Sequence, residues 1–180
     1  MRTLWLLCLL LATDVTSQVK AANMRSFIEA VRRKAAVVYV GSVKEVHEVG
    51  RTKFDIKARA IVTISEIARG PGTKPAEAIV EYSSYDDKTP MLAGGPQYQL
   101  RPGAMVLIFA DSFESSIRPR YLLQGSRAEL LERVTALRDN LKRMSADELK
   151  RNEIDEEDRQ VQLALYEKLG GFLGRGGKEK

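Results

Sequence analysis

Cysteine and histidine each occur only once among the 180 residues, and tryptophan is equally rare. The single cysteine, Cys8, lies near the start, so the rest of the chain has no thiol for a disulfide, a thiolate nucleophile or a cysteine metal site. The single histidine, His47, excludes a zinc site built from several histidines, and its polar neighbours predict an exposed strand-end position. We therefore expect no metal and no cofactor.

Apolar runs long enough to span a membrane are also missing, and the longest run, at the N-terminus, is short. Arg2 precedes the run Leu4–Ala12, and polar residues follow it. A membrane-spanning helix takes about 20 apolar residues, so this shorter run is typical of a secretory signal peptide, here residues 1–17, cleaved after Ser17. We expect a secreted or periplasmic protein without a permanent membrane anchor; a buried N-terminal helix is the alternative. The lack of disulfides favours a bacterial source.

The net charge of +5 is unevenly distributed. Residues 18–125 contain 16 Lys or Arg and 11 Asp or Glu, whereas residues 126–180 contain 12 of each. A mild basic surplus can favour acidic partners, and it is also ordinary for a soluble protein. About 160 residues after the signal peptide suffice for one domain with a hydrophobic core and a modest appendage.

Alternation of apolar and polar residues predicts a strand-rich region. The predicted strands span residues 35–46, 54–64, 77–82, 98–100, 105–110 and 120–124. Gly41 is expected to bend or bulge the first strand, and Phe54 is the first of the inward-facing residues of the second strand. The continuous apolar run 105–110 suits a strand that is covered on both faces.

Helical spacing appears before and after the strands. A short leading helix is predicted over 24–34, and a second begins at Ser126, which forms a capping-box pattern with Glu129. Ser145 starts a third helix in the same way. A last helix is predicted over 156–169, ended by two glycines at positions 170 and 171. We expect the apolar stripe of the second helix, Leu130 to Met144, to pack on the chain's own sheet; binding of a partner is the alternative.

Four phrases carry a resemblance to a known family: AVVYVGSVKEV, a strand ending in ISEIARG, IVEY, and YQLRPGAMVLIFA. In their order and spacing, over residues 27–124, the chain resembles the netrin-like domain, an OB-fold superfamily that includes the tissue inhibitors of metalloproteinases. The resemblance implies an α+β fold, with a five-stranded OB-like (netrin-like) β-barrel and its leading helix over 24–125. A helical tail over 126–169 and a disordered end over 170–180 complete the expected organisation.

The inhibitory mechanism of that family does not transfer to this chain. Its animal members reach the protease zinc through an N-terminal cysteine held by disulfides, and no cysteine follows the signal peptide here. Nucleic-acid binding, common among OB folds, is not expected either. Its candidate aromatic residues, Tyr39, Tyr82, Tyr98 and Phe109, lie on apolar strands where core packing is the default.

No catalytic constellation is visible, so we expect a non-enzymatic binding module that recognises a protein or an envelope component. The longest irregular stretch between the strands, residues 83–96, is the predicted contact loop, because loops on rigid scaffolds often carry binding residues. Its candidate binding residues are Tyr85, Asp86, Asp87, Lys88, Met91 and Leu92. The alternative is an envelope enzyme, or an enzyme accessory or inhibitor, that uses the same loop; calcium binding by the adjacent aspartates is a lesser possibility.

Overall fold

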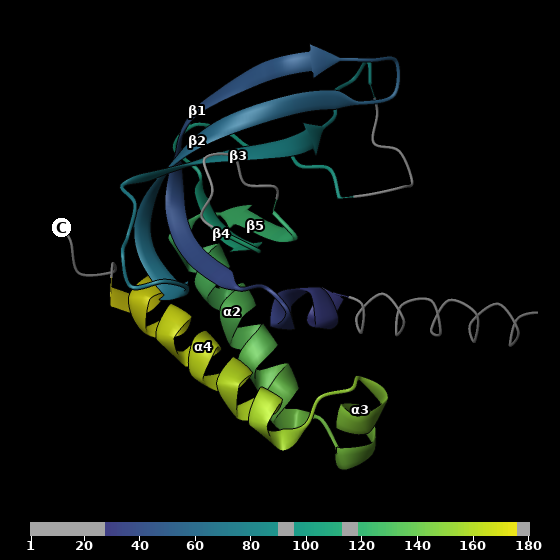
Figure 1. The fold of residues 1–180 in the computed structure, drawn as a ribbon, viewed down its shortest axis with the longest axis vertical. Helices are drawn as coiled ribbons and strands as arrows, with labels where there is room; N and C mark the ends of the chain where they lie inside the picture. The colour runs from purple at the N-terminus through teal and green to yellow at the C-terminus, as the bar shows by residue number, and fades with distance from the viewer. Residues whose placement is uncertain (1–27, 90–95, 113–118, 176–180) are drawn as a thin grey trace, which may run out of the picture.

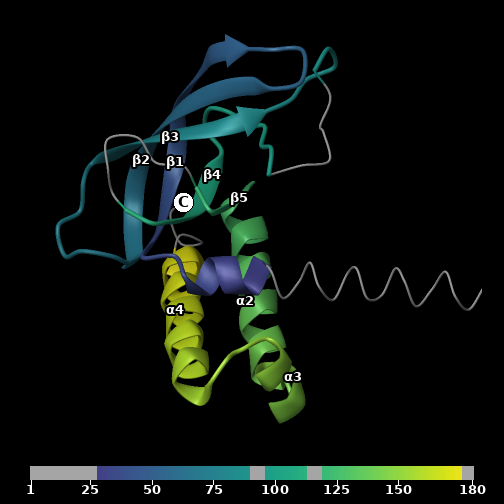
Figure 2. The ribbon, with the colours of Figure 1, turned by 45° about the vertical axis from the view of Figure 1, so that its right-hand side comes forward.

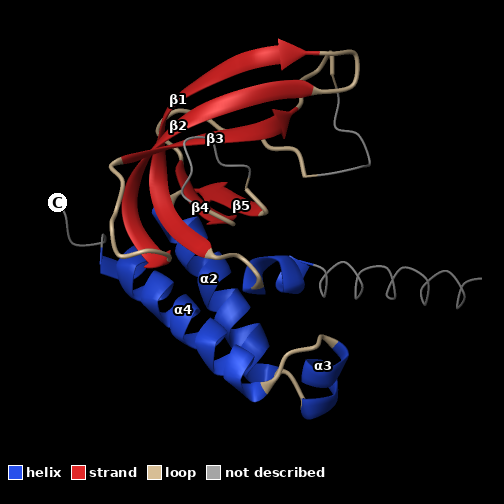
Figure 3. Ribbon diagram, viewed as in Figure 1, coloured by secondary structure: helices blue, strands red, loops and turns tan. Residues whose placement is uncertain are grey.

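The computed structural model describes residues 28–89, 96–112 and 119–175, and these form an α+β structure (Figure 1). Strands occupy one half of the molecule and helices the other (Figure 3). Residues 28–33 are helical and form the described part of the predicted leading helix. The expected signal peptide, residues 1–17, lies outside the described residues.

Five strands form one antiparallel sheet in the order β3-β2-β1-β4-β5. They are β1 (Val37–Arg51), β2 (Ile56–Arg69), β3 (Glu77–Ser84), β4 (Met105–Ala110) and β5 (Tyr121–Gly125). The first four have the spatial order 4-1-2-3 of a Greek key. β3 and β5 are the two edge strands, so the sheet is not closed.

β1 pairs with two neighbouring strands, β2 on one side and β4 on the other. Its first six residues, 37–42, pair with β4, whereas residues 38–51 pair with β2. The outer part of β1 therefore extends with β2 and β3 away from the helices (Figures 1 and 2). The register shifts between Val40 and Gly41, which confirms the predicted irregularity. A Cβ atom on Gly41 would lie 2.6 Å from the carbonyl oxygen of Thr63, so glycine permits the close approach of the two strands.

An apolar core lies on each face of the sheet, because successive side chains of a strand point to opposite faces. The first core contains the alternating β2 residues Ala58, Ala60, Val62 and Ile64, as predicted, together with residues of all the other strands. The second core lies between the sheet and the helices. β4 contributes to both, with Val106 and Ile108 in the first and Leu107 and Phe109 in the second. The prediction that this strand is covered on both faces is confirmed.

The C-terminal helices are α2 (Arg127–Arg143), α3 (Ala146–Arg151) and α4 (Glu156–Arg175). Ser126 and Ser145 cap α2 and α3, each with the complete capping box that the sequence predicts. Leu130, Val134 and Leu141 of the α2 stripe are buried in the second core. The stripe thus packs on the chain's own sheet and on α4, which lies beside α2 (Figure 2).

The last helix is longer than predicted. The two glycines at 170 and 171 do not end α4, which continues to Arg175. Leu169 and Leu173, one helical turn apart, are both buried in the second core. The guanidinium of Arg127 also donates to the carbonyl oxygen of Phe172 over 3.1 Å. These tertiary contacts outweigh the low helix propensity of glycine, which amounts to about 1 kcal/mol per residue.

The predicted strand at 98–100 is absent. This segment connects the two edge strands through isolated hydrogen bonds. The backbone amide of Tyr98 donates to the carbonyl oxygen of Ser83 over 2.9 Å, and the side-chain amide of Gln124 donates to the carbonyl oxygen of Gln99 over 2.6 Å. Side chains supply much of its attachment, so no backbone ladder forms.

Candidate binding surface at the hairpin tip

The turn between β1 and β2 is organised by one threonine. The Thr52 hydroxyl oxygen accepts hydrogen bonds from the backbone amides of Phe54 and Asp55 over 3.2 and 3.0 Å, and the Thr52 amide donates to the Asp55 carbonyl oxygen over 2.8 Å. This turn leaves the side chain of Phe54 59% exposed and that of nearby Val49 51% exposed. The prediction that Phe54 faces the core is wrong, because β2 begins only at Ile56.

Arg51 connects this turn to the segment that follows β3. Its guanidinium binds both carboxylate oxygens of Glu48, over 3.0 and 2.7 Å, and donates to the Asp86 carboxylate over 2.8 Å. A weaker bond reaches the Thr89 hydroxyl at 3.3 Å. The hydrogen bonds from Arg51 lower the pKa of Glu48, and the two carboxylates raise the pKa of Arg51. The hairpin tip and the turn 85–89 are therefore held together.

Asp86 has its carboxylate engaged within the protein. Besides Arg51, it accepts from the backbone amides of Lys88 and Thr89 over 3.0 and 2.7 Å. The Asp86 amide in turn donates to the Thr89 carbonyl oxygen over 2.9 Å. The bond from Arg51, followed by that from the Thr89 amide, lowers the pKa of Asp86. Asp86 thus shapes the turn, and its carboxylate has little capacity left for a partner or for calcium.

The other predicted site residues occupy different environments. Tyr85 is half-buried, and its carbonyl oxygen accepts from the Gln99 side chain over 2.9 Å. Asp87 and Lys88 are exposed. Met91 and Leu92 lie outside the described residues. Of the predicted residues that are described, Asp87 and Lys88 are therefore the ones most open to a partner.

The hairpin tip and the turn 85–89, which Arg51 joins, carry exposed apolar and charged side chains. We call these residues the hairpin-tip surface: Val49, Lys53, Phe54, Asp87 and Lys88. The Lys53 ammonium lies 5.3 Å from the centre of the Phe54 ring, a cation–π distance. Sequence analysis missed Phe54 because it continues the apolar alternation of β2, and it missed Val49 because that residue lies beyond the first predicted strand, residues 35–46. Gly50 and Thr52 between them, typical turn residues, were a usable signal that the pairing ends there.

The structure also places the other residues that the sequence analysis considered, the strand aromatics and the histidine. Tyr39, Tyr82 and Phe109 are buried in the core, and Tyr98 is half-buried with its ring edge-on to that of Tyr82. His47 is exposed, as predicted, with its Nε2 atom 3.1 Å from the Glu45 carboxylate. Within residues 28–89, 96–112 and 119–175, no group of three or more His, Cys, Asp or Glu side chains gathers as metal ligands would.

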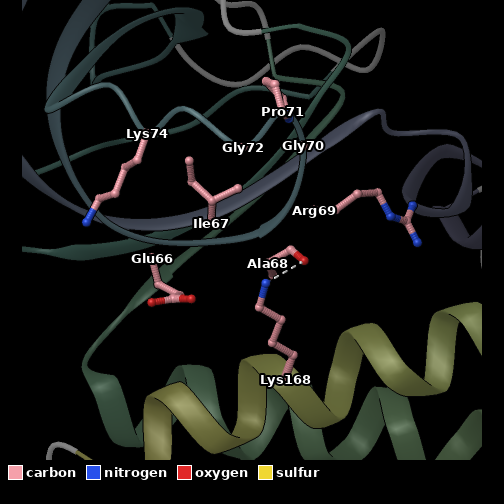
Figure 4. A pocket seen from close by; sticks show the side chains of 9 residues that line it. All are labelled: Glu66, Ile67, Ala68, Arg69, Gly70, Pro71, Gly72, Lys74 and Lys168. Atoms are coloured by element: carbon pink, nitrogen blue, oxygen red, sulfur yellow. Dashed lines mark hydrogen bonds between the residues drawn. The ribbon is translucent and has the colours of Figure 1, made fainter.

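A pocket of about 330 Å³ lies between the end of β2, the turn that follows it and α4 (Figure 4). Its cations do not converge on a shared point. Lys168 donates to the carbonyl oxygen of Ala68 over 3.3 Å, and Lys74 donates to that of Ser65 over 2.7 Å. The guanidinium of Arg69 points away from both lysines (Figure 4). These hydrogen bonds support the backbone, so this pocket is a weaker candidate than the hairpin tip.

The chain is an α+β protein in which helices cover one face of an open Greek-key sheet. The hairpin of β1 and β2 projects from the end of the molecule away from these helices (Figure 1). No helix in the described part of the chain is long and apolar enough to cross a bilayer. Comparison with protein-family models and with curated protein sequences finds no match.

Proposed function

We propose that this chain is an exported, non-enzymatic binding module that recognises a protein or a cell-envelope component through the hairpin-tip surface. The observation that carries the proposal is the exposure of Phe54, at 59%, on a turn fixed by hydrogen bonds. Aromatic residues are enriched at protein interfaces, where a polar rim surrounds the apolar centre. Lys53 and Lys88 are exposed polar residues of this kind of rim.

The bonds of Arg51 support a binding role for this surface. Since Arg51 joins Glu48 of β1 to Asp86 of the following turn, both segments are ordered before any partner arrives. Binding by a preorganised surface avoids much of the entropy cost of ordering loops at the interface. A rigid hairpin with an exposed aromatic residue is thus suited to specific recognition.

The strand order supports the proposed netrin-like, OB-like architecture. An OB fold is a five-stranded, partly open Greek-key barrel. In this chain the Greek key is formed by β1 to β4, and the segment 97–100 is hydrogen-bonded to β3 through Ser83 and to β5 through Gln124. We propose that this segment occupies the opening of an OB-like barrel between its two edge strands.

The rival proposal, an envelope enzyme or an accessory or inhibitor that uses the loop 83–96, has weaker support. Asp86 accepts from Arg51 and two backbone amides, and bonds to its charged form lower its pKa, which makes it a poor general base. Neither the pocket beside Lys168 nor the one beside Arg32 is lined by residues 85–89. A projecting surface rather than a cleft favours recognition over catalysis.

Affinity capture from an envelope extract tests the proposal. We expect Phe54→Ala to abolish capture of the partner that the unchanged chain retains, because it removes the main apolar contact. Its free energy of unfolding should change by only about 0.5 kcal/mol, as for other surface substitutions. The matched control is Val161→Ala, whose side chain is 51% exposed on α4, a helix at the opposite end of the molecule from the hairpin (Figure 1). Equal capture by the unchanged chain and by Phe54→Ala would contradict the proposal.

A further inference from the structure

A second pocket, of about 560 Å³, lies at the other end of the molecule, between the leading helix, β5 and α2. Its volume falls within the range of small-molecule sites. The lining combines apolar, aromatic and charged side chains: Ile28, Glu29, Arg32, Tyr121, Leu137, Asn140, Arg143, Met144 and Glu148.

Arg32 distinguishes this pocket from an ordinary surface depression. The residue is only 6% exposed, and its guanidinium lies 5.1 Å from the centre of the Tyr121 ring. One nitrogen donates to the carboxylate of Glu29, whereas the Nε atom is buried without any hydrogen-bond partner. A guanidinium has five N–H donors, and burying such a group with donors unmet is costly. Arg32 thus lines the pocket with one buried donor unmet.

The other charged groups of the lining add to this surplus of donors. Arg143, exposed at the end of α2, donates to Asn140 over 3.0 Å and to the Asp139 carbonyl oxygen over 3.2 Å, which leaves further N–H groups on its guanidinium. The Glu148 carboxylate is engaged by the amide and hydroxyl of Ser145, over 2.8 and 3.0 Å. Arg143 keeps N–H groups free and Arg32 has an unmet N–H group, whereas the carboxylates of Glu29 and Glu148 already accept hydrogen bonds within the protein. A complementary ligand is therefore rich in hydrogen-bond acceptors.

We propose that this pocket binds a small carboxylic acid with an apolar body. The carboxylate is held by Arg32 and Arg143, whose planar guanidinium groups match its geometry. The apolar body lies on Ile28, Leu137 and Met144, which line the same cavity. This site is separate from the hairpin-tip surface, so it stands or falls independently of the proposed function.

Octanoate titrated into the purified chain tests the proposal, with octan-1-ol and acetate as matched probes. Octanol keeps the apolar body without the carboxylate, and acetate keeps the carboxylate without the body. We expect saturable binding of octanoate, with both other compounds weaker by about tenfold or more, as the loss of a charge-assisted contact or of several buried methylenes implies. Amide resonances of residues 28–32 and 137–144 should shift in the NMR spectrum.

Two arginine variants identify the group that holds the carboxylate. Because the Arg143 side chain is exposed, the Arg143→Gln variant should fold normally, and we expect it to bind octanoate about tenfold more weakly. Arg32→Gln should weaken binding at least as much. Arg133→Gln, on the exposed side of the same helix and outside the pocket, should bind like the unchanged chain. Equal binding of octanoate and octanol, unchanged affinity in Arg143→Gln, or resonance shifts confined to residues 49–54 and 85–89 would each overturn the proposal.

Discussion

Replacing Gly41 with alanine tests the close contact between β1 and β2 at this position. The new Cβ atom would lie 2.6 Å from both the Thr63 carbonyl oxygen and a methyl carbon of Val62, whereas ordinary contacts measure 3.4–4 Å. One of these neighbours is backbone, so relief requires β1 and β2 to separate. Overpacking of this kind costs about 1–3 kcal/mol. For a chain of this length, that lowers the melting temperature by about 2–12 °C.

Gly50→Ala is the matched control, because it makes the same substitution in the same strand. A Cβ atom there meets nothing within 4 Å, so the free energy of unfolding should change by about 1 kcal/mol at most. Thermal unfolding followed by circular dichroism compares the two variants. If Gly41→Ala and Gly50→Ala unfold at the same temperature, the two strands do not approach as closely at Gly41 as the structure has them, and the reasoning fails.

Two further predictions concern the ion pairs of Arg51 and the core beneath α4. The folded-state pKa values of Glu48 and Asp86 are lowered by Arg51, so their stabilising contribution is present above the unfolded values of about 4 and is lost as the pH falls through the folded values. The difference in melting temperature between the unchanged chain and Arg51→Gln should therefore shrink on acidification from about pH 5 to pH 2, and a constant difference would argue against these ion pairs. In α4, Leu169→Ala should cost about 2–5 kcal/mol in urea unfolding, because the side chain is fully buried, whereas Val161→Ala should cost less than about 0.5 kcal/mol; similar values for both would show that α4 does not pack as described.

Features with a local physical cause were predictable from the sequence. The two capping boxes at Ser126 and Ser145 depend on residues three positions apart, and both form as predicted. The turn before β4 has Gly103 at a backbone φ of 82°, a conformation that glycine adopts readily, and the Ala104 amide closes the turn on the Arg101 carbonyl oxygen over 3.1 Å. The strands follow from the two-residue period of their buried side chains.

The candidate site was only partly predictable, because its decisive contacts join distant parts of the chain. The sequence placed Asp86 correctly in a loop beside the sheet. Its hydrogen bond from Arg51, 35 positions away in the sequence, could not be predicted, and this bond occupies a carboxylate that was expected to bind a partner. The exposure of Phe54 depends on where β1 and β2 stop pairing, and an alternating pattern continues past that point without a break.

Local sequence patterns were enough to predict most of the elements: five of the six expected strands, the bulge at Gly41, the caps of α2 and α3, and the apolar stripe of α2. Tertiary structure alone decided how they combine. It set the strand order and the open sheet edge, extended α4 past its two glycines through the burial of Leu173, and enclosed the pocket beside Arg32. The physical reason is that periodicity and capping act within a few residues, whereas these outcomes depend on burial and hydrogen bonds between segments far apart along the chain.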